Sequence, residues 1–221
     1  MTVATTPVPK SPPAALVHAR RNRVEFVTVP ERAYLAVDGC ERPGGQTYQN
    51  AIATLYPIAY ALHFRLKRAG VKAPVGTLEG LYWLTPDDVM DEHRAREASE
   101  RSHSWSWRLL IPVPEVATEE DVECAVREAA GRRTLPALSR FHVVRWTEGP
   151  SAQILHVGRY AAEGPTMAKL AAAIVDGGFE PNGPHHEIYL NNPSQVGEDR
   201  ARTIIRQAVR PDLSATQEGR P

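Results

Sequence analysis

Hydrophobic positions along the chain switch repeatedly between a period of two and a helical period of 3.6. This alternation predicts an α+β fold in which strands and helices follow one another. The predicted strands span residues 24–37 with a break near Pro30, 76–84, 105–113, 141–146, 152–157, 186–190 and 203–209. The predicted helices span residues 46–69 with a kink at Pro57, 118–131 with a capping box of Thr118 and Asp121, and 165–176 before two glycines.

The strands at 141–146 and 152–157 flank a short turn, Thr147–Pro150. Neighbouring strands joined by such a turn usually pair with each other. We therefore expect an antiparallel hairpin here.

The order strand, helix, strand, strand occurs twice along the chain. YLAVDG, the long helix, GLYWLTP and WRLLIPV form the first copy, and ILHVGRY, its helix, EIYLNNP and TIIRQAV form the second. Tyr82 and Pro86 align without a gap to Tyr189 and Pro193. The pattern predicts a duplicated βαββ fold with pseudo-twofold symmetry, repeat halves of about 24–135 and 136–210, and a central ligand cleft between them.

Three segments have compositions typical of loops or tails. Residues 1–23 hold four prolines and no acidic residue, which predicts a flexible N-terminal arm before the domain at 24–210, and residues 211–221 should form a flexible tail. Residues 86–103 are highly charged and should be an exposed loop or a short surface helix.

Composition and charge exclude several classes of protein. The 221 residues carry 26 Lys and Arg against 26 Asp and Glu, so no basic field favours direct nucleic-acid binding. No apolar run is long enough to span a bilayer and no signal core is evident, so we expect a soluble, cytoplasmic protein without a membrane partner. Cys40 and Cys124 lie far apart, which argues against a disulfide framework or a cysteine zinc site.

The sequence His185-His186-Glu187 is a candidate for site chemistry. Alternation along a strand puts His185 and Glu187 on one face and His186 on the other, and only His156 could add a third ligand, so we predict no metal and no cofactor. Glu187 is a lone carboxylate in an apolar strand. It is either paired with an arginine or exposed at a rim, or it faces the cleft and activates water or attracts a cation.

Aromatic side chains form a second candidate group. Glu79, Leu81 and Trp83 share one face of their strand, and pairing with the next strand would let Trp83 and Trp107 wall a flat slot, unless both tryptophans belong to the core. Tyr56 precedes the predicted kink. It either donates its hydroxyl into the cleft or packs between helix and sheet.

Several segments together resemble a known family. YLAVDGCERP, LEGLYWL, WSWRLLIPVP, ILHVGRYAAEGPT and especially HHEIYLNNP are similar to the GyrI-like small-molecule-binding domains, in particular the branch of cyclopropanoid cyclopropyl hydrolases. The resemblance covers about residues 24–210. It implies a SOUL-like duplicated architecture, with Glu187 as the cleft glutamate and Trp83, Trp107 and Tyr56 as aromatic positions around the ligand.

The resemblance implies a detoxifying hydrolase that confers drug resistance. It would open the cyclopropane ring of spirocyclopropyl-cyclohexadienone DNA-alkylating compounds by adding water. We assign Glu187 and Tyr56 to catalysis, and Trp83, Trp107, Glu79 and His156 to binding a flat aromatic ligand. The alternative is a non-catalytic binder that sequesters flat aromatic or cationic molecules, and a third possibility is a protein that guards gyrase through its outer surface.

Overall fold

The computed structural model describes residues 16–83 and 106–213, so the predicted surface segment at 86–103 lies outside the described residues. The chain divides into two compact units. We call residues 16–30 and 147–213 the terminal unit, and residues 31–83 and 106–146 the central unit.

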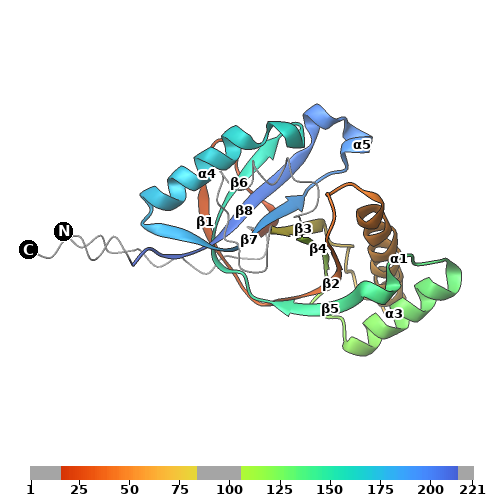
Figure 1. The fold of residues 1–221 in the computed structure, drawn as a ribbon. Coiled ribbons are helices and arrows are strands. Elements are labelled where there is room, and N and C mark those ends of the chain that lie inside the picture. The colour runs from red at the N-terminus through yellow and green to blue at the C-terminus, as the bar shows by residue number, and fades with distance from the viewer. Residues whose placement is uncertain (1–15, 84–105, 214–221) are drawn as a thin grey trace, which may run out of the picture. The chain divides into compact units, whose positions relative to one another are not determined.

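The central unit is a four-stranded antiparallel sheet with two helices. Its elements are β2 (Arg32–Gly39), α1 (Gln46–Arg68), β3 (Leu78–Trp83), β4 (Ser106–Pro112), α3 (Glu119–Arg132), the short helix η2 (Leu138–Arg140) and β5 (Phe141–Trp146). The strand order is β3-β4-β2-β5. In Figure 1, α1 and α3 run alongside each other next to this sheet, and Arg65 on α1 binds Asp121 on α3 at 2.7 Å.

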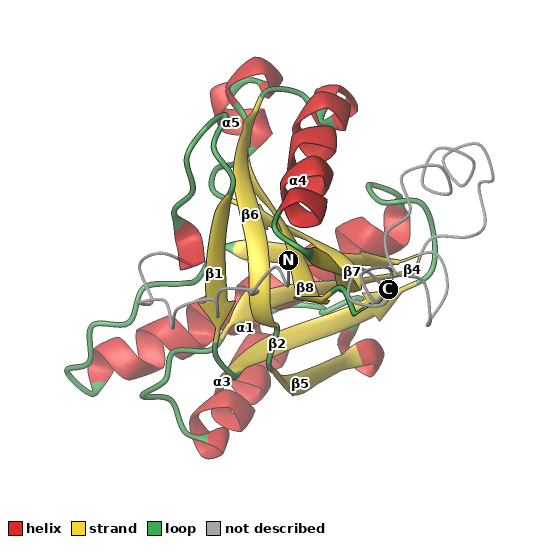
Figure 2. Ribbon diagram, turned by 90° about the vertical axis from the view of Figure 1, so that its left-hand side faces the viewer, coloured by secondary structure: helices red, strands yellow, loops and turns green. Residues whose placement is uncertain are grey.

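The terminal unit has the same plan. Its elements are β1 (Glu25–Val29), β6 (Gly149–Val157), η3 (Tyr160–Ala162), α4 (Gly164–Asp176), β7 (Phe179–Tyr189), α5 (Pro193–Val196), η4 (Glu198–Arg200) and β8 (Arg202–Pro211). The strand order is β1-β6-β8-β7, again antiparallel. Figure 2 shows α4 lying beside β6.

The α+β class and the duplicated βαββ order are confirmed. The elements β2-α1-β3-β4 and β6-α4-β7-β8 are equivalent, and their strands lie in the equivalent orders β3-β4-β2 and β7-β8-β6. The capping box of Thr118 and Asp121 is also present, because the Thr118 hydroxyl accepts from the Asp121 amide and the Asp121 carboxylate accepts from the Thr118 amide.

The predicted hairpin of β5 and β6 is wrong. β5 pairs with β2, and β6 pairs with β1 and β8. The turn after Trp146 instead carries the chain from one unit to the other. Each repeat therefore takes its fourth strand from the segment that precedes the other repeat: β1 precedes β2 but pairs with β6, and β5 precedes β6 but pairs with β2.

The described chain begins inside the range that the sequence assigned to a flexible arm. Leu16 and Ala19 are buried, and the Gln153 side chain donates to the carbonyl of His18 at 3.0 Å. Arg21 forms a parallel bridge with Leu155 on β6. Residues 16–21 are thus docked on the terminal unit, because both backbone and apolar side chains find partners there.

A buried ionic cluster supports this docking. Glu148, His186 and Arg206 have almost no exposed side-chain surface, and Glu148 lies 3.0 Å from the His186 ring and 3.2 Å from the Arg206 guanidinium. Arg206 also donates to Gln153 and to the carbonyl of Leu16. Burial raises the pKa of Glu148, but the charges of His186 and Arg206 more than offset it and hold that pKa below its usual value.

Glu148→Ala should destabilise the terminal unit by about 3–5 kcal/mol, because it leaves the Arg206 charge buried without its counter-charge. The matched control is Glu31→Ala, whose partner Arg145 is 3.6 Å away on the surface, and which should change stability little. Urea denaturation measures both. Equal losses in the two variants would contradict this role of the cluster.

Two glycines let aromatic rings of the central unit lie against the backbone. A Cβ on Gly39 would lie 2.1 Å from the Trp107 ring, and a Cβ on Gly80 would lie 2.6 Å from the Tyr82 hydroxyl. Trp107 is fully buried, and its indole N–H donates to the carbonyl of Glu41 at 2.8 Å. These close contacts fix the aromatic packing between β3, β4 and α1.

Gly39→Ala should cost about 3 kcal/mol or more, because neither the Trp107 ring nor the strand can move away easily. Gly131→Ala is the control: it lies in α3 with nothing within 4 Å of the added carbon, and should stabilise the protein by about 0.5–1 kcal/mol. Thermal unfolding compares the two. An unchanged midpoint for Gly39→Ala would show that the ring can move aside.

Candidate active site

The sheet of the terminal unit brings Glu187 under α4. Ile154 on β6 faces Ile205 on β8, which in turn faces Glu187 on β7. Ile154 and Ile205 belong to the core cluster that includes Leu170 and Ile174 of α4. Glu187 therefore lies in a row of side chains on the sheet face that α4 covers.

His185 shares this face and contacts Glu187. Its Nε2 lies 3.2 Å from Glu187 Oε1, and the two side chains are only 10% and 15% exposed. His186 points to the opposite face, where it binds Glu148, as the alternation along the strand predicts. Among the described residues, the buried arginine of this sheet, Arg206, pairs with Glu148 and not with Glu187. Glu187 is thus a shielded carboxylate held by a histidine.

A second carboxyl, which the sequence did not single out, lies beside Glu187. Glu163 precedes α4 and is 6% exposed, and its Oε1 is buried without a hydrogen-bond partner among the described residues. Burial, followed by the negative charge of Glu187, raises the pKa of Glu163 to about 9. At neutral pH Glu163 is therefore a neutral carboxylic acid beside Glu187.

His156 fixes the segment that carries Glu163. Its Nε2 is 3.2 Å from the carbonyl of Arg159, to which it donates, and its Nδ1 is 3.0 Å from the Thr166 hydroxyl. Both ring nitrogens are occupied by these contacts. His156 thus ties β6 to the segment around Glu163, and its role in binding ligand stays a prediction.

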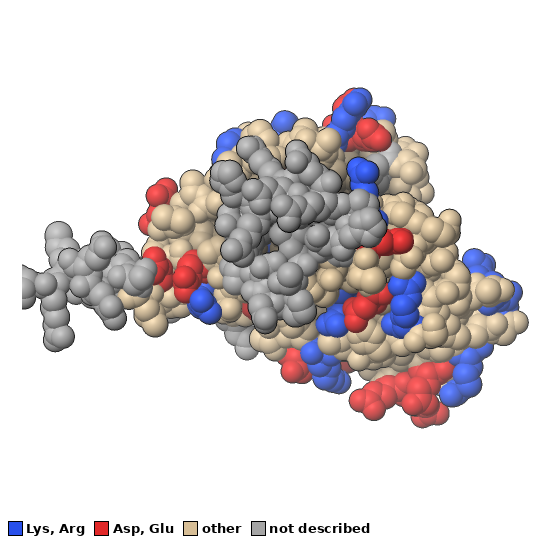
Figure 3. All heavy atoms as spheres, in the orientation of Figure 1, with Lys and Arg blue, Asp and Glu red and all other residues tan. Residues whose placement is uncertain are grey.

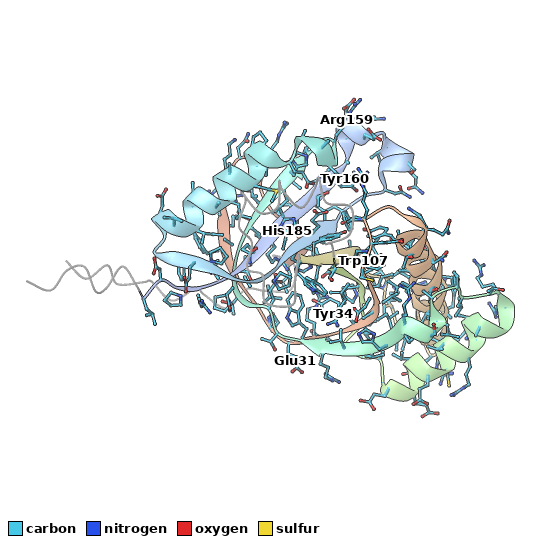
Figure 4. The ribbon with its side chains drawn as sticks, viewed as in Figure 1. Glu31, Tyr34, Trp107, Arg159, Tyr160 and His185 are labelled. Carbon is cyan, nitrogen blue, oxygen red and sulfur yellow. The ribbon has the colours of Figure 1, made fainter. Side chains whose placement is uncertain are left out.

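Two tyrosines lie on the same part of the terminal unit. Tyr189, two residues after Glu187, packs edge-on against Tyr160 with ring centroids 5.9 Å apart. Tyr160 is 45% exposed. In Figure 4, Tyr160 lies next to Arg159 just before α4, and His185 lies on β7. Tyr189 on β7 and Tyr160 on η3 together form an aromatic surface next to the strand that carries Glu187.

The slot walled by Trp83 and Trp107 is not formed. The register pairs Trp107 with Tyr82 and Trp83 with Ser106, so the two tryptophans project from opposite faces of the sheet. Trp107 packs edge-on against Tyr48 of α1 at 5.1 Å and is fully buried, as a core residue. Trp83 is partly buried and packs against a cluster on the other face. Alternation along the sequence predicts which side chains share a face within one strand, but it does not predict the register between strands.

The other predicted residues also belong to the central unit. Glu79 is 2% exposed and faces the same way as Leu81 and Trp83. Tyr56 is half-buried on α1, its ring is 6.3 Å from that of Tyr60, and burial, followed by the effect of Tyr60, raises its pKa. Their roles beside Glu187 stay predictions.

The described residues hold no group of three or more metal-ligating side chains. No described helix is long and apolar enough to cross a membrane. On the face shown in Figure 3, basic and acidic side chains are interspersed over the described surface.

Comparison with known proteins places the chain in a family. The model of the GyrI-like small molecule binding domain matches residues 22–209. The chain belongs to the GyrI-like family. A solved structure, that of an uncharacterized conserved protein from Listeria innocua, has 29% identity and a TM-score of 0.76, covering 89% of this chain and 96% of its own. A hydrolase from Listeria innocua has 28% identity and a TM-score of 0.72 with the same coverage.

More distant structures share the fold. The C-terminal domain of EcmrR has 10% identity and a TM-score of 0.51, covering 86% of this chain and 98% of its own. None of the curated proteins matches the chain.

Glu163 should make stability depend on pH. Its pKa is about 9 in the folded chain against an ordinary value of 4.5, so between these pH values the folded chain holds a proton that the unfolded chain has lost. The contribution of this proton to the free energy of unfolding is fully present below pH about 4.5 and is lost as pH rises towards 9. The free energy of unfolding then falls by up to about 1.4 kcal/mol per pH unit.

Glu163→Gln keeps the shape of the neutral acid and should flatten this slope. Urea denaturation between pH 5 and pH 9, which lies within the range between the two pKa values of Glu163, measures how the free energy of unfolding changes with pH. Glu180→Gln is the control, because Glu180 pairs with Arg210 at the surface of β7. Parallel curves for wild type and Glu163→Gln would contradict a proton at Glu163.

Proposed function

We propose that the protein is a hydrolase that opens the cyclopropane ring of spirocyclopropyl-cyclohexadienones by adding water, and so detoxifies DNA-alkylating compounds. The observation that carries the proposal is Glu187, a shielded carboxylate bound to His185 and free of an arginine partner among the described residues. A structurally similar protein from Listeria innocua, 28% identical to this chain, is a hydrolase. The motif HHEIYLNNP supports the same branch of the family.

The reaction needs few protein groups because ring strain supplies driving force. A water molecule attacks the less substituted cyclopropane carbon, a C–O bond forms, and one cyclopropane C–C bond breaks. The bonding electrons enter the dienone ring, which becomes an aromatic phenol when its oxygen gains a proton. The water loses one proton, so the product differs from the substrate by one added water.

Glu187 suits the basic role in this scheme. Its carboxylate can orient the water and take its proton, while the contact to His185 fixes its position. Tyr189 and Tyr160 provide aromatic surface for a flat ligand on the same unit. The ligand-contacting roles of Tyr56, Trp83 and Glu79, which belong to the central unit, stay predictions from the sequence.

A non-catalytic binder is the second candidate, favoured by the family's character as a small-molecule-binding domain. In that case Glu187 would serve as counter-charge for a cationic ligand. Quenching of tryptophan fluorescence reports binding under either proposal, whereas product mass separates them. Recovery of a bound but unchanged cyclopropane compound after hours would exclude the hydrolase.

Glu187→Gln should lower kcat by about 100-fold or more, because the amide cannot take a proton from water. The KM for an uncharged cyclopropane substrate should change little, since the shape of the side chain is kept. Glu180→Gln, on the same strand but at the surface, is the control and should be fully active. Product formation is followed by mass spectrometry. Full activity of a folded Glu187→Gln protein would remove Glu187 as the base.

A further inference from the structure

The position of Glu163 is unusual for an acidic residue at the start of a helix. It is the N-cap residue of α4, where a carboxylate normally accepts hydrogen bonds from the first free amides and is stabilised by them. Its side chain makes no such bond. The carboxyl therefore does not serve to cap the helix.

The carboxyl is instead turned into the protein. Glu163 is 6% exposed, and one of its oxygens is buried without a hydrogen-bond partner among the described residues. A buried polar atom without a partner costs stability, and a side chain needed only for packing would not carry it. The arrangement leaves an oxygen available to a ligand.

The neighbours of Glu163 complete a paired site. Glu187 interacts with it electrostatically, and His185 holds Glu187 at 3.2 Å. His156 ties down Arg159 and Thr166, on either side of Glu163 in sequence. Two carboxyl groups in unlike environments, one neutral and one charged, are the arrangement in which one acts as acid and the other as base.

We propose that Glu163 is a second catalytic residue, the general acid that protonates the oxygen of the substrate as Glu187 takes a proton from water. This inference rests on the proposed hydrolase function. As the cyclopropane C–C bond breaks, its electrons move onto the dienone oxygen, which takes the proton of Glu163 and becomes a phenol. Glu163 is left as a carboxylate and Glu187 as an acid, and exchange of one proton between the site and water restores both.

This assignment narrows the substrate class. The ligand must present a carbonyl oxygen conjugated to the strained ring, because that oxygen is where negative charge collects and where an acid is useful. A cyclopropane without such a carbonyl would gain nothing from Glu163. The raised pKa of Glu163 also keeps the acid protonated through neutral pH.

The test compares wild type, Glu163→Gln and Glu198→Gln, an exposed control before β8 whose partner is Arg159 at 3.6 Å. Two spirocyclopropyl-cyclohexadienones are used, one plain and one with an electron-withdrawing substituent that makes its phenol product more acidic. With the plain substrate, Glu163→Gln should lower kcat by about 100-fold with little change in KM. With the substituted one the loss should shrink at least several-fold, because its dienone oxygen forms a more stable phenolate and needs a proton less.

The pH profile is the second readout. Wild type should lose kcat/KM as pH rises through about 9, and this alkaline limb should be absent from the residual activity of Glu163→Gln. An equal loss with both substrates, or an unchanged alkaline limb, overturns the inference while leaving the hydrolase intact. Wild type that turns over neither substrate overturns the proposed function itself.

A third measurement covers the case in which Glu163→Gln does not fold. The infrared spectrum of wild type at pH 7.5 should contain the carbonyl band of a buried protonated carboxylic acid, which should disappear on titration above pH about 9. The Glu198→Gln control should keep this band. Its absence from wild type overturns Glu163 as the acid.

Discussion

The exchange of β1 and β5 is the constraint on which the rest of the structure depends. Each repeat alone supplies three strands, and the free edge of its first strand is filled by a segment that precedes the other repeat. The terminal unit completes its sheet only when β1 pairs with β6, although the strands of the central unit, β2 to β5, lie between them in the chain. The terminal unit therefore depends on a pairing between distant parts of the chain, whereas the described strands of the central unit follow one another within it, and each unit has its own core.

The prediction from sequence was good where the signal is local. Periodicity identified the helices, the capping box at Thr118 and the equivalence of the two βαββ copies, because these depend on residues close together in the chain. It failed for β5, whose partner β2 lies about a hundred residues earlier, since turn residues at 147–150 are compatible with a hairpin and with a passage between units alike. Long-range pairing of this kind leaves no mark within a short window of sequence.

The site shows the same division. Alternation placed His185 and Glu187 on one face, as the structure has them, but it could not show that Trp107 is opposite Tyr82 and belongs to the core. Glu163 was missed because an acidic residue before a helix ordinarily serves as a cap or a surface charge. Only its burial and the absence of a capping bond distinguish it, and neither can be found in the order of residues alone.

The contact between Gly80 and Tyr82 has a further consequence for the history of the duplication. In the aligned copies Gly80 corresponds to Glu187 and Tyr82 to Tyr189. Because Gly80 has no side chain, the Tyr82 ring lies over its backbone and its hydroxyl meets that of Tyr48 at 2.9 Å, filling the place that a carboxylate holds in the other copy. The two copies thus share the order and pairing of their strands and helices, but they differ in the side chains at this position. Within the described residues, the carboxyl pair of Glu163 and Glu187 is present in one copy of the repeat and not in the other.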